Sequence, residues 1–166
     1  MNSRLPIAGL AIAALVLAGC QGSAAHDGSA KNGYSKQKVV YHVNYDNPKK
    51  QGGALRNIQN HINAVGKENL DIKVIMHGNG LSMLVDPDSL AHLPKFKKAN
   101  GNQKMTAKVD GLKDQGVSFS VCANTIRGKK VDMAGDLHDV SKKDIVPSGV
   151  AELAHLQDAG YSYIKP

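Results

Sequence analysis

Short apolar stretches alternate with longer amphipathic stretches along this chain. The short stretches predict five β-strands, at residues 38–46, 71–78, 117–122, 145–147 and 161–164. In the first of them, one face carries Val39, Tyr41, Val43 and Tyr45. The second is almost continuously apolar, as a strand covered on both faces should be. The pattern therefore indicates a sheet at the centre of the fold.

The longer stretches predict helices between these strands, at residues 54–66, 103–115 and 149–159. A turn at 46–48 and the pair Gly52-Gly53 precede the first helix. Ser148 is suited to cap the third helix, because its hydroxyl can accept a hydrogen bond from a free N–H of the first turn. We expect Val150, Leu153 and Leu156 to form the apolar face of that helix.

Strands that alternate with helices predict an α/β fold, a three-layer α/β/α sandwich with a mainly parallel five-stranded sheet. Residues 79–101 and 131–143 lack periodicity and would form long connections, the first with one helical turn at 81–85. In parallel sheets, binding sites lie beyond the carboxyl ends of the strands. That edge would collect Asn44, Tyr45, His77, Gly78, Cys122, Pro147 and Ser148.

The amino terminus has the pattern of a secretion signal. Residues 1–19 combine Arg4 with an apolar run at 7–18 that is too short to span a bilayer comfortably. The run ends in Leu17-Ala18-Gly19-Cys20, which resembles the lipobox of bacterial lipoproteins. The resemblance implies cleavage before Cys20 and lipidation of its thiol. Ordinary secretion with a free Cys20 is the alternative.

The predicted domain organisation follows from this signal. Residues 20–37 are rich in small and polar residues and would form a flexible tether, and residues 38–166 would form one domain. We therefore expect a lipid-anchored protein on the periplasmic face of a bacterial cell envelope. Gln21 is not the aspartate associated with inner-membrane retention in enteric bacteria, so the outer membrane is favoured.

The chain is basic, with 21 Lys and Arg against 14 Asp and Glu and a formal net charge of +7. Basic charge often indicates nucleic-acid binding. Export, scattered lysines, the absence of Trp and the presence of only two Phe argue against that partner here. The basic surface would then attract anionic lipid headgroups or small anions, or simply face solvent.

The stretch Val117–Arg127 carries the main candidate for chemistry. Cys122 would end a strand, and a helix would begin at Ala123. The unpaired N–H groups and positive dipole end of a helix's first turn lower the pKa of a nearby thiol, and the thiolate is the reactive form. With Cys20 lipidated, Cys122 has no partner for a disulfide within the chain. We expect a reactive thiol open to solvent; a small, inert core cysteine is the alternative.

Four further residues are candidates for the rim around this thiol. His77 could act as a base or a hydrogen-bond partner, with a packing role in a loop as the alternative. Arg127 could hold an anion, although it also suits a solvated helix end. Asn124 and Ser148 are suited to capping helices before any role in a site.

No cofactor and no metal are expected. Residues 44–53 lack the phosphate-binding loop of flavodoxins and dinucleotide-binding folds, which argues against FMN and NAD. The histidines and Cys122 show neither H-x-x-x-H nor C-x-x-C spacing, so a dedicated metal site is not expected.

Four segments together resemble the DsrE/DsrF-like (YchN-like) family, especially its secreted members. They are KVVYHVNYDNP, VIMHGNGLSML, GVSFSVCANTI and VPSGVAELAHLQDAGYSYIKP, between Lys38 and Pro166. The resemblance implies a three-layer α/β/α domain with a parallel sheet, commonly assembled as a trimer or hexamer. In the sulfur-relay members, a cysteine at the position that matches Cys122 carries sulfane sulfur as a persulfide. Those members are typically cytoplasmic and work with partner subunits and a sulfur donor.

Two functional interpretations stay open. In the first, the chain is a lipid-anchored periplasmic protein that carries sulfur as a persulfide on Cys122, with a sulfur donor or acceptor protein as its partner. It would be at most a carrier or transferase-like relay protein, so the sequence does not decide whether it is an enzyme. In the second, it is a non-enzymatic oligomeric binding module in which Cys122 is structural.

Overall fold

The computed structural model describes residues 33–166, and the predicted signal peptide and lipidation site at Cys20 lie outside them. The strands are β1 (Gln37–Val43), β2 (Leu70–Met76), β3 (Ser118–Cys122), β4 (Ile145–Val146) and β5 (Ser162–Ile164). They form one sheet in the order β4-β3-β2-β1-β5, and every pair is parallel. The predicted α/β fold with a parallel five-stranded sheet is confirmed.

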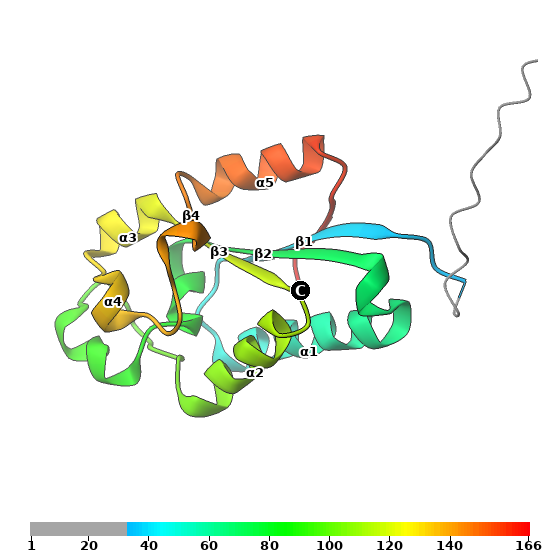
Figure 1. The fold of residues 1–166 in the computed structure, drawn as a ribbon. Coiled ribbons are helices and arrows are strands. Elements are labelled where there is room, and N and C mark those ends of the chain that lie inside the picture. The colour runs from blue at the N-terminus through cyan, green and yellow to red at the C-terminus, as the bar shows by residue number, and fades with distance from the viewer. Residues whose placement is uncertain (1–32) are drawn as a thin grey trace, which may run out of the picture.

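Helices cover both faces of this sheet (Figure 1). α1 (Pro48–Val65) and α2 (Gln103–Lys113) lie on one face, and α5 (Gly149–Asp158) lies on the other. α3 (Ala123–Lys129) and α4 (Met133–Asp136) gather near the carboxyl ends of the strands. Since a parallel sheet needs both faces covered, the three layers follow from the strand arrangement.

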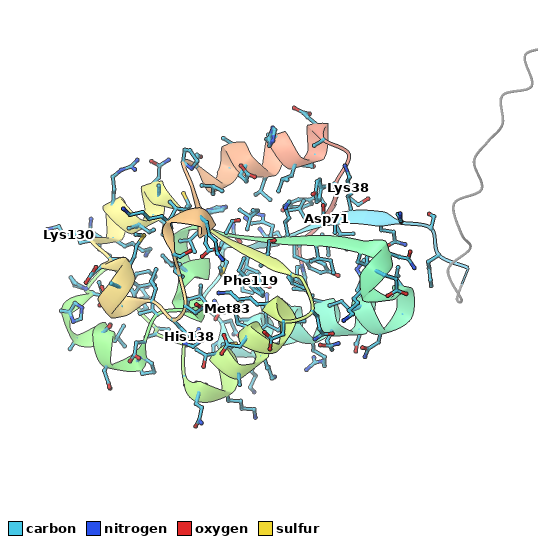
Figure 2. All side chains as sticks on the ribbon, viewed as in Figure 1. Lys38, Asp71, Met83, Phe119, Lys130 and His138 are labelled. Atoms are coloured by element: carbon cyan, nitrogen blue, oxygen red, sulfur yellow. The ribbon has the colours of Figure 1, made fainter. Side chains whose placement is uncertain are left out.

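Two hydrophobic clusters flank the sheet. The larger cluster joins β1, β2 and β3 to α1 and α2, and Figure 2 shows Met83 and Phe119 within it. The smaller cluster lies beneath α5 and consists of Val40, Ile75, Leu153, Leu156 and Tyr161. Successive residues of a strand face opposite sides, and β1 and β2 accordingly contribute to both clusters.

The first helix begins at Pro48, earlier than the predicted start at Ala54. The side chain of Asn47 accepts a hydrogen bond from the N–H of Lys50 at 3.1 Å, which caps the helix, and proline is favoured at its first position. The pair Gly52-Gly53, predicted to precede the helix, lies inside it. Each glycine costs about 1 kcal/mol relative to alanine in a helix interior, and burial of the helix's apolar stripe offsets that cost.

The two segments without periodicity also contain short helices. Between β2 and α2, the chain forms the 3₁₀ helices η2 (Gly78–Met83) and η3 (Pro87–His92). Leu81, Met83, Leu84 and Val85 are fully buried there, so this connection is part of the core. Within the second segment, the chain forms α4 and the 3₁₀ helix η4 (Lys142–Asp144). Such turns are too short to produce a periodic sequence signal.

The prediction for the apolar face of α5 is wrong at one residue, Val150. Val150 is 66 % exposed, whereas Gly149, Leu153 and Leu156 are buried. A glycine gives no apolar signal, and the sequence pattern therefore placed Val150 on the buried stripe instead. The predicted cap is present, because Ser148 accepts a hydrogen bond from the N–H of Ala151 at 3.4 Å.

Candidate functional site

Cys122 lies where the sequence predicts it, at the end of β3 and directly before α3 (Figure 1). Phe119 and Val121 belong to the larger hydrophobic cluster. Strand alternation turns Ser120 and Cys122 to the opposite face, which α5 covers. The thiol is therefore at the carboxyl edge of the sheet, between the first turns of α3 and α5.

The side chain of Cys122 is buried, with 5 % of its surface exposed, so the expectation of a solvent-open thiol is wrong for the single chain. Gly149, the first residue of α5, lies against it. A Cβ at that glycine would stand 3.3 Å from Cys122 Cβ and 3.0 Å from His77 Cβ. A side chain at this position would therefore force His77, Cys122 or the start of α5 to shift.

Four hydrogen-bond donors surround the sulfur. They are the backbone N–H groups of Asn124, Thr125 and Gly149, and the hydroxyl of Thr125. Burial raises the pKa of the Cys122 thiol, but the four donors lower it by more, so the pKa lies below the ordinary value of 9.0. The site therefore favours an anionic sulfur despite its burial.

Thr125 is itself held in place by the loop after β2. Its hydroxyl oxygen accepts a hydrogen bond from the N–H of Gly78 at 2.8 Å. The oxygen is thereby occupied as an acceptor, and its own proton is available to the sulfur. This pair of bonds links the start of α3 to the end of β2 through the candidate site.

A row of polar side chains continues across the sheet from the thiol. His77 directly follows Met76, which pairs with Val121 of β3, and this register places His77 beside Cys122. His77 Nε2 lies 2.7 Å from His42 Nε2 on β1, and His42 Nδ1 lies 2.6 Å from the hydroxyl of Tyr163 on β5. The row thus joins residues of β3, β1 and β5 with His77, the residue that follows β2.

Both histidines of this row are kept neutral. Burial lowers the pKa of His42 to about 4, with further lowering by the charges of His77 and Lys165. Burial, followed by the charge of Lys165, also lowers the pKa of His77. At neutral pH each imidazole therefore carries one N–H and one bare nitrogen.

The side chains of the other three predicted site residues do not bond to the sulfur. Asn124 acts on the sulfur through its backbone N–H, while its side-chain oxygen accepts a hydrogen bond from Arg127. Arg127 is exposed, and its guanidinium bonds this side chain rather than the thiol. Ser148 contributes by capping α5, which places the N–H of the next residue, Gly149, at the sulfur.

A family model for the DsrE/DsrF-like family matches residues 37–166, which include every element of this site. The chain belongs to the DsrE/DsrF-like family. Membership indicates a role related to sulfur relay. A search among curated proteins found no match.

A solved structure shares this DsrE/DsrF-like fold. It is described as the structure of a protein of unknown function, MTH1491, from Methanobacterium thermoautotrophicum. The two chains are 26 % identical, with a TM-score of 0.62, and the match covers 79 % of this chain and 100 % of the other. The similarity therefore extends over the domain that holds Cys122.

Three residues of the DsrE/DsrF-like site were missed at the sequence level: His42, Gly149 and Tyr163. His42 and His77 share a face only in the parallel register of β1 and β2, in which His42 pairs with Ile75. That register cannot be read from either strand alone. Gly149 could have been recognised as a site residue only if its neighbours in the fold had been known.

Within residues 33–166, no three or more His, Cys, Asp or Glu side chains converge in a way that could hold a metal ion. In the same residues, no helix combines the length and the apolar character needed to cross a bilayer.

Proposed function

We propose that this DsrE/DsrF-like protein carries sulfane sulfur as a persulfide on Cys122. The observation that supports the proposal best is the set of four hydrogen-bond donors around the sulfur. Hydrogen bonds to a charged acceptor are stronger than those between neutral groups, so these donors favour a thiolate before loading and an anionic persulfide afterwards.

The loading reaction is a thiol–disulfide type of exchange. The Cys122 thiolate attacks the outer sulfur of a donor persulfide, and a new sulfur–sulfur bond forms while the bond within the donor breaks. The donor's inner sulfur leaves with the bonding electron pair. Because Cys122 is 5 % exposed, small persulfides and polysulfide are better suited than bulky donors to reach it in the single chain.

Mass spectrometry of the purified native protein tests the loading. After incubation with inorganic polysulfide, we expect an added mass of about 32 Da, one sulfur atom, on the peptide that contains Cys122. Cys122→Ser, which keeps the volume and removes the thiol, should show none. A wild-type protein that stays unmodified under these conditions would refute the proposal.

The proposal also includes a cellular location and partners. A lipid anchor at Cys20 would hold the domain on the periplasmic face of the envelope, more readily at the outer than the inner membrane, as the lipobox-like segment and Gln21 suggest. A trimeric or hexameric assembly and a protein donor or acceptor of sulfur belong to this scheme; nucleic acid does not. Metabolic labelling with palmitate, lost in Cys20→Ala, tests the anchor, and light scattering tests the assembly.

The burial of Cys122 favours a second candidate, a non-enzymatic binding module in which this cysteine is structural. Alkylation by iodoacetamide separates the two. The sulfur-carrier proposal expects native Cys122 to react readily near neutral pH, because its thiolate is favoured. Reaction only after unfolding would leave the binding module as the better account.

A further inference from the structure

We propose that a groove between α1 and α2 binds a phosphate group, with Arg56 and Lys108 as its central contacts. The two helices lie side by side on the face of the sheet opposite α5 (Figure 1). Cys122 is turned toward the α5 face, so the groove is separate from the thiol. The inference therefore goes beyond the proposed sulfur chemistry and does not depend on it.

The groove is formed by one side of each helix. On α1 these residues are Lys49, Gly52, Arg56 and Gln59, and on α2 they are Lys104, Lys108 and Gly111, followed by Gln115. Intervals of three and four residues place side chains on the same side of a helix. Each helix therefore presents cations at one end of the groove and a glutamine at the other.

The groove has two adjoining parts that share Arg56 and Lys108. The first part has a volume of about 500 Å³ and is also lined by Lys49 and Lys104. The second has a volume of about 360 Å³ and includes Leu55 and Leu112. Volumes of this size accommodate a small organic ligand.

The cations of the groove lack acidic partners. Within residues 33–166, no carboxylate forms an ion pair with Lys49, Arg56, Lys104 or Lys108. α1 contains no acidic residue, and the one acidic residue of α2, Asp110, bonds His138 instead. Four unneutralised positive charges around one groove repel one another, and an anion between them would relieve that repulsion.

Two glycines keep the groove open. Gly52 and Gly111 lie inside helices, where glycine is less favourable than alanine. No atom lies within 4 Å of a Cβ added at either position, so close packing does not require a glycine there. Both residues line the groove, and a larger side chain at either would narrow it.

A pair of glutamines holds the two walls together. The Nε2 of Gln59 donates to Oε1 of Gln115 at 2.9 Å, and the Nε2 of Gln115 donates to Oε1 of Gln59 at 2.8 Å. Gln115 also donates to the carbonyl oxygen of Gly111 at 2.7 Å. These bonds fix the spacing of the helices before a ligand binds, which lowers the entropic cost of binding.

The side chains of the groove fit a phosphate better than a carboxylate. A guanidinium matches two phosphate oxygens at once, and lysines add point charges, so four cations suit a group with two negative charges. The apolar floor at Leu55 and Leu112 suits an apolar substituent beside that group. A lipid headgroup and a soluble phosphate compound share this chemistry.

Two probes distinguish these sources. Calorimetry measures binding of inorganic pyrophosphate, and sedimentation measures binding to vesicles of phosphatidylglycerol and phosphatidylcholine, with vesicles of phosphatidylcholine alone as the reference. We expect Arg56→Gln combined with Lys108→Gln to weaken binding at least about 10-fold. Raising the salt concentration from about 0.05 M to about 0.5 M should also weaken binding by the wild type.

Lys67→Gln combined with Lys130→Gln is the matched control, because it also removes two positive charges. Lys67 follows the far end of α1, and Lys130 lies beside α3 and α4, away from α1 (Figure 2). This variant should bind as the wild type does. Gly111→Gln, which keeps the charge but narrows the groove, should bind more weakly. Urea denaturation checks that each variant is folded.

The outcomes separate the sources and the alternatives. Pyrophosphate binding that Arg56→Gln with Lys108→Gln weakens would support a soluble phosphate, and the same effect with vesicles alone would support a lipid headgroup. Failure of the wild type to bind either probe, or equal losses in the two double variants, would overturn the proposal. Loading of Cys122 with polysulfide is measured separately, so either result leaves the sulfur-carrier proposal intact.

Discussion

At the scale of single residues, the ionisation of Cys122 is controlled by hydrogen bonds from the backbone rather than by a neighbouring cation. Three of its four donors are N–H groups from the starts of α3 and α5. Arg127, the cation nearest in sequence, bonds the side chain of Asn124 instead. Backbone donors are held by the helices themselves, so the sulfur is stabilised without ordering a long flexible side chain.

Thr125 supplies the one side-chain donor, and its removal should be measurable. Thr125→Val takes away a hydrogen bond that favours the charged form of the sulfur, so we expect the pKa of Cys122 to rise. The pH dependence of ultraviolet thiolate absorbance measures this pKa. Thr125→Ser keeps the hydroxyl and should retain the wild-type value; a Val variant with an unchanged pKa would contradict the assigned bond.

A side chain at Gly149 should disturb the site. In Gly149→Ala, the added methyl would lie 3.0 Å from His77 Cβ and 3.2 Å from His77 Cδ2, so either His77 or the start of α5 must move. We expect the free energy of unfolding to fall by about 1–3 kcal/mol and the pKa of Cys122 to rise, as judged by urea denaturation and by pH-dependent alkylation. Val150→Ala, at the exposed next position, should change stability by less than about 0.5 kcal/mol.

At the scale of elements, the termini of helices and strands determine where the site lies. The start of α3 and the start of α5 converge on the end of β3 because the strands are parallel and share one carboxyl edge. The connection after β2 closes the same edge, where Gly80 of η2 packs on the carbonyl oxygen of Val43 at the end of β1.

Two glycines should respond to alanine in opposite directions. Gly52 lies inside α1 with no atom within 4 Å of an added Cβ, so Gly52→Ala should stabilise the protein by about 0.5–1 kcal/mol. In Gly80→Ala, the Cβ would stand 2.0 Å from the carbonyl oxygen of Val43, and we expect a loss of about 3 kcal/mol or more. Urea denaturation measures both. Destabilisation by Gly52→Ala would instead favour the prediction from sequence, in which Gly52 precedes the helix.

At the scale of the whole molecule, the parallel sheet assembles the polar row from distant parts of the chain. His42 and Tyr163 are 121 residues apart in sequence and 2.6 Å apart in space. The sheet order puts β1 between β2 and β5, which makes His42 the central member. Burial of a neutral histidine at that position couples the stability of the fold to pH.

Acid should weaken the fold in a defined interval. The pKa of His42 is about 4 in the folded protein and 6.5 in its ordinary state, so the unfolded chain binds more protons between these values. The stabilisation is therefore complete above pH 6.5 and is lost as the pH falls towards about 4. We expect the free energy of unfolding to drop on the order of 2 kcal/mol between neutral pH and about pH 5 in urea denaturation. His42→Asn should flatten this dependence; an equal drop in the variant would assign it to other groups.

Several features of the site were predictable from local pattern. Strand alternation placed Cys122 at the end of β3 and turned it away from the larger cluster, and the change of period at Ala123 placed a helix directly after it. The cap at Ser148 was also readable from residue type. The start of α1 could not be predicted in this way. The pair Gly52-Gly53 disfavours a helix, and only the packing of α1 against the sheet shows that the helix includes it.

The sequence by itself determined where the five strands and the main helices between them lie, that the sheet is mainly parallel, and that Cys122 ends a strand at the carboxyl edge. These properties depend on spacings within one segment or on the alternation of neighbouring segments. Only the tertiary structure decided that Cys122 is buried, that Gly149 reaches its sulfur, and that His77, His42 and Tyr163 join into one row. Burial and hydrogen bonding between remote residues depend on strand register and on the close approach of separate elements, which no single stretch of sequence contains.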